Sequence, residues 1–304
     1  MIKFYEKRKI YFAISALIMI IGIICLFING VKLSIQFKGG AILKYSYVGE
    51  IDVNKVADLS SDILKRNTEV QLTEDLATNS KKVVLNLAGN SGLAANEQEE
   101  LDKALREEFK ENDLELSESN VVEPFIGKSF FEKGIIAMLL SATMIVVYVW
   151  RRFTKISGLS AAFVALLALL HDILVVFFIF VIFRIPINDS FIAVVLTIIG
   201  YSVNDTIVIY DRIRENKRLF PKLQVEELVD LSINQSVSRS VNTTISTALS
   251  VFVIYIFAAM YNIESIKVFA LPMLFGVLSG CYSTICIAGP VWVMWQKRKK
   301  AVAQ

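Results

Sequence analysis

Residues 198–216 read IIGYSVNDTIVIYDRIREN, an apolar run that ends in charged residues. The run begins as a membrane-spanning helix and ends as a loop at the membrane surface. Asn204 and Asp205 nevertheless lie inside the apolar part, and Asp205 precedes Asp211 by roughly 9 Å of helix. A carboxylate at such a depth costs roughly 2.5–3.5 kcal/mol on insertion scales, so it is a functional hypothesis by default. The stretch predicts a membrane helix that carries a functional carboxylate, Asp205.

The composition of the whole chain agrees with this interpretation. The 304 residues are 55% hydrophobic and 20% charged, and the mean hydropathy is +0.55. Such a chain is too apolar for a soluble enzyme, and its charges are clustered. A helix needs about 20 apolar residues to cross the hydrocarbon core. Six runs fit: Tyr11–Ile28, Gly134–Trp150, Gly158–Phe183, Ser190–Tyr210, Val241–Tyr261 and Ile266–Trp295. No A-x-A-like cleavage site follows the first run, which predicts an uncleaved span.

Basic residues predict the orientation of these spans. Four clusters, within residues 3–9, 151–155, 212–222 and 297–300, all fall on one side of a six-span chain. The two short opposite loops hold only Arg184 and Lys267. The positive-inside rule then places both termini in the cytoplasm. The expected segments are 1–29 with the first span, an extracytoplasmic domain at 30–131, a five-helix membrane bundle at 132–295 with a cytoplasmic loop near 211–240, and a basic tail at 296–304.

The polar segment 30–131 is long enough for a small domain of its own. Strand patterns occur at 41–48, 69–73, 81–87 and 117–125, and helical patterns at 53–67 and 96–112, the latter with Asn96 as its expected cap. The order β-α-β-β-α-β predicts a split βαβ, ferredoxin-like sandwich. The segment carries no Gly-rich phosphate loop, metal-ligand cluster or nucleophile–base pair. A binding or mechanical role is therefore favoured over catalysis, and neither a cofactor nor a metal is expected.

Residues 219–240 form an amphipathic stretch between the fourth and fifth spans. Val225, Leu228, Val229, Leu231 and Ile233 lie on one side of the expected helix, and acidic residues form much of the other. The helix either lies along the inner membrane surface, docks on a partner, or is a solvated cap of the bundle. The pattern leaves these alternatives open.

Arg239 is the expected partner of Asp205. It lies just before or inside the fifth span, and consecutive spans can be neighbours. A buried Asp that shares its environment with a proton and a guanidinium can act as an ion relay. The alternative is a buried ion pair that only clamps the helices together. Polar residues from 234 to 247 continue this region as a ladder that either bridges helices or lines a wetted path.

His171 and Asp172 interrupt the third span near its centre. A histidine titrates in the physiological range, and a neighbouring carboxylate adds a second exchangeable site. The pair therefore belongs either to the ion path or to a hydrogen bond that orders a neighbouring helix. For Asp172 the functional interpretation is favoured. Gly276 and Gly280 have the GxxxG spacing typical of close helix packing.

Together these residues resemble the SecD/SecF family, accessory membrane subunits of the bacterial Sec protein-export machinery. GYSVNDTIVIYDRIREN is very similar to the family's fourth-span signature, which includes Asn204, Asp211 and Arg212. QFKGG resembles its F-x-G-G element, here Phe37, Gly39 and Gly40. His171-Asp172 and NQSVSRSVNTTIST resemble the third-span HD and the Asn/Ser/Thr-rich stretch around an arginine. Serines replace some of the usual threonines near Arg239, and Tyr210 replaces a common Phe.

The resemblance implies a fold and a function. The fold is an α-helical polytopic membrane protein with six transmembrane helices, half of an RND-type bundle, and a small α+β ferredoxin-like extracytoplasmic domain between the first two helices. The implied partners are SecD, the SecYEG channel, an exported unfolded polypeptide and membrane lipid, with no nucleic acid. Proton or sodium motive force would drive the outer domains, with Asp205 as the ion carrier, Arg239 tuning it, and Asp172 near the path. The implied location is the bacterial cell membrane.

Two other functions compete with this one. An RND-type exporter of lipids or small molecules is disfavoured because its outer domain should be larger. A structural subunit that binds SecD without carrying ions stays open, because a relay and a clamp use the same residues.

Overall fold

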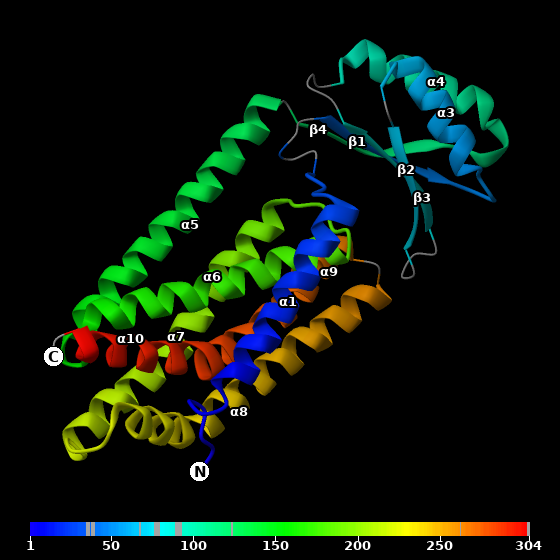
Figure 1. Cartoon of the computed structure of the whole chain (residues 1–304). Helices are drawn as coiled ribbons and strands as arrows, with labels where there is room; N and C mark the ends of the chain where they lie inside the picture. Colours follow the sequence, from blue (N-terminus) through cyan, green and yellow to red (C-terminus); the bar gives the residue numbers. More distant parts are fainter. Residues whose placement is uncertain are drawn as a thin grey trace.

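A computed structural model describes residues 1–34, 37, 40–66, 68–75, 80–88, 93–122, 124–261 and 263–302. Within this part of the chain, six helices are long and apolar enough to cross a membrane, which confirms the predicted number. The first five are α1 (Arg8–Asn29), α5 (Pro124–Arg152), α6 (Gly158–Ile182), α7 (Asp189–Leu219) and α8 (Val225–Met260). The sixth consists of α9 (Glu264–Tyr282), a π-helical turn (Ser283–Ala288) and α10 (Gly289–Val302) (Figure 1).

Two predicted helix boundaries were wrong. Helix α5 begins at Pro124, ten residues before the predicted Gly134, because proline fits the first turn of a helix. Helix α8 is a single helix from Val225, whereas the sequence suggested a separate surface helix over 219–240. The stretch from Val225 to Met260 holds no glycine or proline, so nothing in it ends a helix.

Helix α6 occupies the centre of the bundle. It is apolar all round, and most of its side chains are buried, including the small residues Ala161, Ala165 and Ala168. Helices α1 and α5 instead expose most of their apolar side chains, as expected for surfaces that face lipid. The amphipathic start of α8 packs inward, with Val229 and Ile233 in the same core cluster as the inner end of α6. Of the three alternatives for 219–240, the cap of the bundle is nearest to the structure, and its apolar side packs on this chain's own helices.

The four basic clusters meet at one end of the bundle, which we call the basic end. Lys217 Nζ donates to the Lys155 carbonyl across 3.1 Å, and Lys297 pairs with Glu226 at 2.6 Å. The N-terminal segment joins them, since the Ile2 N–H donates to Asn234 Oδ1 across 2.9 Å. Figure 1 shows both chain termini at this end and the sheet at the other. The clusters therefore share one end, as predicted, and its assignment to the cytoplasm stays a prediction from charge.

The segment between α1 and α5 folds around a four-stranded antiparallel sheet. Its strands are β1 (Gly40–Tyr47), β2 (Thr68–Asp75), β3 (Ser80–Ala88) and β4 (Glu115–Val122), in the order β2-β3-β1-β4. Helices α3 (Val53–Leu64) and α4 (Ala95–Glu108) cover one face (Figure 1), where Leu43 and Leu85 of the sheet pack in one cluster with Leu101 and Leu105 of α4. The β-α-β-β-α-β order is the predicted one.

Two predicted ends in this region were shifted. Helix α4 begins at Ala95 and is preceded by Ala94, whose N–H donates to the Glu97 carboxylate across 3.1 Å, so Asn96 is not the cap. Glu97 reaches back over the first turn to the N–H of the residue that precedes the helix, as in a capping box. Strand β4 ends at Val122 rather than at 125, because α5 already begins at Pro124.

A short link joins the sheet to the bundle. Phe37 is only 7% exposed and belongs to a core cluster that includes Phe180 and Phe191. Its ring meets Phe131 of α5 edge-on, with 5.1 Å between centroids. Three residues later Gly40 begins the central strand β1 with a φ of +142°, a conformation that favours glycine. The predicted F-x-G-G element thus connects the two parts of the chain, and its Gly39 lies outside the described residues.

Candidate functional site

Asp205 of α7 is held from one side only. Its Oδ1 accepts a hydrogen bond from Ser240 Oγ on α8. Its Oδ2 is buried and has no hydrogen-bond partner among the described residues. A buried carboxylate oxygen without a partner is costly and marks a site where another group can bind. The carboxylate is therefore placed in the apolar part of the helix, as predicted, but it is only half satisfied.

The predicted pair between Asp205 and Arg239 is wrong in this structure. Arg239 is exposed, and it makes no ion pair with Asp205 although both residues are described. Adjacent residues project about 100° apart around a helix. Because Ser240 faces Asp205, its neighbour Arg239 points away from the contact.

The outward sides of α7 and α8 carry small and polar residues within the membrane spans. Those on α7 are Ala193, Thr197, Gly200 and Asn204, and those on α8 are Arg239, Asn242, Thr243 and Ser246; all are exposed. We call these eight residues the polar face. A Cβ added to Gly200 meets nothing within 4 Å, so no described helix of this chain packs closely against it. Exposed amides and guanidiniums are unfavourable against lipid, so this face is suited to protein contact.

Asp172 forms a second polar centre, fully buried between three helices. Three hydroxyls surround it at 2.6–2.8 Å: Ser279 donates to Oδ1, and Ser202 and Ser283 donate to Oδ2. These serines come from α7, α9 and the π-helical turn. The carboxylate therefore ties the central helix α6 to both α7 and the last span.

His171 borders this centre. Its Nδ1 lies 3.3 Å from Asp172 Oδ1 and 3.5 Å from Ser279 Oγ. Its Nε2 is buried without a partner among the described residues. The imidazole thus orders Asp172 through one nitrogen and leaves the other free.

The sequence did not predict the serine ligands of Asp172. Ser279 and Ser283 were not singled out, and Ser202 was not assigned to Asp172. A usable signal was present, because Ser279 adjoins the GxxxG pair and Ser283 follows at helical spacing. A Cβ added to Gly280 would lie 3.2 Å from Ser202 Cβ, so this glycine brings the two serine-bearing helices together.

The remaining motif residues lie at the basic end, away from both carboxylate centres. Asp211 pairs with Arg214 at 2.8 Å and with Arg152 at 3.3 Å. Arg212 donates to Gln235 and to Glu215, each across 2.7 Å. Part of the polar ladder of α8 bridges helices, since Thr244 accepts from Tyr201 across 3.2 Å, whereas its members in the polar face are exposed.

The fold and these two centres define a polytopic membrane protein with carboxylates inside its helix bundle and a folded domain at one end. The family described as protein export membrane protein SecD/SecF, C-terminal, matches residues 101–298. The protein translocase subunit SecF of Synechocystis sp. is 31% identical over 89% of this chain and 82% of its own length. SecF of Rickettsia akari is 32% identical over 97% of this chain and 92% of its own length. The chain belongs to the SecD/SecF family, on its SecF side.

Solved structures agree with this assignment. The chain matches SecDF of Thermus thermophilus, described as a translocon-associated membrane protein, with a TM-score of 0.79 and 27% identity. That match covers 97% of this chain and 39% of SecDF. A SecDF structure in a super-membrane-facing form gives a TM-score of 0.69 at 26% identity. This match covers 99% of this chain and 40% of that SecDF chain. The chain therefore spans about two fifths of the SecDF chains that it matches.

Proposed function

We propose that this chain is a SecF-like subunit that pairs with SecD in the bacterial cell membrane, with both termini in the cytoplasm. The pair uses proton or sodium motive force to promote the late, extracytoplasmic stage of polypeptide export through the SecYEG channel. In this proposal the chain is a translocation subunit without catalytic residues.

The unpartnered Oδ2 of Asp205 carries this proposal. The oxygen is buried inside a membrane helix, and the hydroxyl of Ser240 serves only the other oxygen. A proton or a sodium ion bound there neutralises the carboxylate and removes the cost of an unsatisfied charge. Such a site can change its occupancy without unfolding the bundle around it.

The polar face supports SecD as the partner. Asn204 directly precedes Asp205, and Arg239 directly precedes Ser240, so the exposed residues border the carboxylate site. The matched SecDF chains are more than twice as long as this one, which leaves room for a second bundle. A second bundle packed on the polar face covers its amides and guanidinium and completes the site. The five-helix bundle and α1 are then one half of an RND-type assembly.

Arg239 supplies the switching element in this proposal. It lies one residue from Ser240, so a rotation of α8 by about 100° exchanges the hydroxyl for the guanidinium beside Asp205. A guanidinium close to the carboxylate favours its charged form and release of the bound ion. Ser240 and Arg239 thereby alternate as partners of the two ionic states.

A structural role is favoured for Asp172 and His171. Three hydroxyls already satisfy the Asp172 carboxylate, and no open side remains for a mobile ion to share. The centre then holds α6, α7 and the last span in register while Asp205 works beside it. In this assignment the serine-lined centre around Asp172 is structural, and Asp205 is the ion relay.

The outer domain has a mechanical or binding role in this proposal. Its strand order fits the ferredoxin-like split βαβ, which lies outside the cytoplasm if the basic end faces inward. Phe37 couples the central strand to α5 and the bundle core. Movements of the bundle reach the sheet through this link, and the sheet acts on the emerging polypeptide.

Asp205→Asn tests the proposal in cells that carry the intact partner, with export of a secreted reporter as the readout. Asn keeps the size and hydrogen bonding but carries no charge. We expect export to collapse while SecD and the variant still copurify. Glu215→Gln is the matched control, because it removes a carboxylate of the same helix outside the apolar part. Unchanged export with Asp205→Asn refutes the relay, and loss of copurification assigns Asp205 to a clamp.

A further inference from the structure

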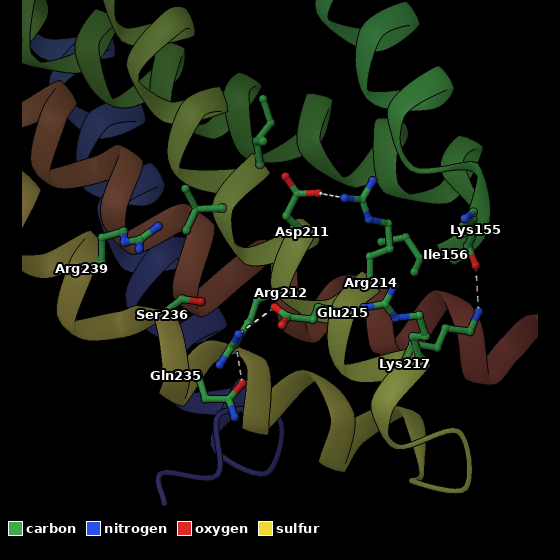
Figure 2. Close-up of a pocket in the computed structure, with 13 residues that line it drawn as sticks. Lys155, Ile156, Asp211, Arg212, Arg214, Glu215, Lys217, Gln235, Ser236 and Arg239 are labelled. Carbon is green, nitrogen blue, oxygen red and sulfur yellow. Dashed lines mark hydrogen bonds and ion pairs between the residues drawn. The ribbon is translucent and has the colours of Figure 1, made fainter.

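A cavity of about 1030 Å³ opens at the basic end, between the α5–α6 connection, α7 and the start of α8 (Figure 2). Six basic side chains line it: Lys155, Arg212, Arg214, Lys217, Arg218 and Arg239. Only two acidic residues, Asp211 and Glu215, share the lining. Neither Asp205 nor Asp172 lines the cavity, and Arg239 of the polar face is at its border with the Asp205 site.

The acidic residues neutralise only part of this charge. Arg212 pairs with Glu215 at 2.7 Å, and Arg214 pairs with Asp211 at 2.8 Å (Figure 2). Asp211 also faces Arg152 from outside the cavity, at 3.3 Å. Within the described residues, the other four cations have no carboxylate within 4 Å. The cavity therefore holds an excess of positive charge that no described carboxylate balances.

The cavity also lies where the polar and apolar parts of α7 meet. Ile207 and Val208 line it toward the membrane core, and Lys217 and Arg218 line it three turns further toward the basic end. Ile156 adds an apolar contact from the α5–α6 connection. One opening thus offers cations at the level of lipid headgroups and aliphatic side chains at the level of the first acyl carbons.

We propose that this cavity binds the phosphate headgroup of an anionic phospholipid. Guanidiniums match phosphate oxygens with paired hydrogen bonds, and basic pockets between membrane helices suit such headgroups. The apolar side toward Ile207 and Val208 favours a lipid over a soluble phosphate or an acidic peptide, neither of which needs it. The bound lipid fills the cavity, balances the excess charge and holds the start of α8 against α7.

The test uses the full-length chain purified in mild detergent, with phosphatidylglycerol as the probe and native mass spectrometry as the readout. We expect phosphatidylglycerol to be retained over phosphatidylcholine. The Lys155→Gln/Arg218→Gln variant removes two exposed cations that bind no carboxylate, so the fold should persist. Each charge is worth about fivefold in affinity, so we expect the variant, which lacks two, to bind about 25-fold more weakly.

Arg298→Gln/Lys299→Gln is the matched control, because it removes two cations from the same end outside the cavity. An equal loss with this control overturns the site, since it indicates diffuse attraction to the surface. Equal retention of phosphatidylcholine and phosphatidylglycerol also overturns it. Displacement of the lipid by millimolar inorganic phosphate alone indicates a free-anion site and contradicts the lipid assignment.

A second measurement separates a lipid from a protein occupant in native membranes. A photo-reactive amino acid replaces Val208, a partly exposed residue of the lining. The expected adduct has the mass of a phospholipid and decreases in the Lys155→Gln/Arg218→Gln variant. An adduct formed only with a protein shows that an acidic segment of a partner occupies the cavity, and this overturns the proposal.

Discussion

Ser279 Oγ donates a hydrogen bond to Asp172 Oδ1 across 2.6 Å and thereby joins the last span to the central helix. Ser283, one turn later, donates to the other carboxylate oxygen across 2.8 Å. The two contacts make the π-helical region of the last span part of the bundle core. The stability of the bundle therefore depends on a few buried hydroxyl groups.

Ser283→Ala should lower the free energy of unfolding by about 1–3 kcal/mol, because it removes one partner of a buried carboxylate. Thermal unfolding in detergent, followed by the fluorescence of Trp150, Trp292 and Trp295, measures the change. Ser250→Ala is the control, since its exposed hydroxyl donates only to the Ser246 carbonyl of its own helix. Equal midpoints for the two variants would contradict a clamp at Asp172.

Gly200→Leu should prevent pairing with SecD while leaving this chain folded. A Cβ at Gly200 meets nothing within 4 Å in the chain, but a leucine would protrude from the polar face. Gly280→Leu is the contrasting variant, because its Cβ would lie 3.2 Å from Ser202 Cβ and force α9 away from α7. Copurification with SecD and the thermal midpoint of the chain alone separate the two effects. Normal pairing of Gly200→Leu refutes the polar face as the interface.

Phe37→Ala should loosen the outer domain from the bundle without unfolding either part. Truncating a buried aromatic ring costs about 3–5 kcal/mol, and here the loss falls on the link between them. Distances between a spin label in α4 and one in α6 should broaden. Phe163→Ala, which removes an exposed ring stacked on Trp295, should leave those distances unchanged. A narrow distribution in Phe37→Ala would exclude this residue as the coupling element.

The outer domain should lose stability in alkali because of Tyr45. Its side chain is fully buried, and its hydroxyl has no hydrogen-bond partner among the described residues. Burial raises the pKa of the Tyr45 phenol, and nearby Asp102 raises it further. The folded chain keeps the proton that the unfolded chain loses above about pH 10, so stability falls as the pH rises.

We expect this loss to reach about 1 kcal/mol near pH 11. Pulse proteolysis in urea at pH 8 and pH 11 measures it. Tyr45→Phe should keep its stability between these values and should be at least as stable as the wild type at pH 8, because no hydroxyl is then left unsatisfied. The same alkaline loss in Tyr45→Phe would assign the effect to other groups.

The sequence was most informative where a residue contradicts its surroundings. Asp172 and Asp205 stand out because carboxylates are rare in apolar spans. The serines around Asp172 do not, since a hydroxyl is tolerated in membrane helices and its partner depends on packing. The choice between Arg239 and Ser240 as the neighbour of Asp205 depends on the rotation of α8 about its axis. Periodicity in a polar stretch does not determine that angle.

For the fold, too, some features were predictable from the sequence and others were not. The six spans were predictable because their length is set by the thickness of the membrane. The continuity of α8 was missed because its charged first turns resemble a surface segment, whereas in the structure they pack on the bundle. The early start of α5 was missed because Lys128, Glu132 and Lys133 interrupt the apolar residues that follow Pro124.

The first residues of the chain make a contact that depends on much later ones. Ile2 and Asn234 exchange two hydrogen bonds across a sequence separation of 232, and the Tyr5 N–H donates to Asp230. Phe4 is buried in the core cluster that includes Val229 and Ile233 of α8. Ribosomes add about 5–20 residues per second, so this separation corresponds to roughly 10–50 s of synthesis.

During that interval the amino terminus has no α8 to bind. Its burial is therefore among the last steps of folding during synthesis. A nascent chain that stalls before residue 234 keeps Phe4 unburied.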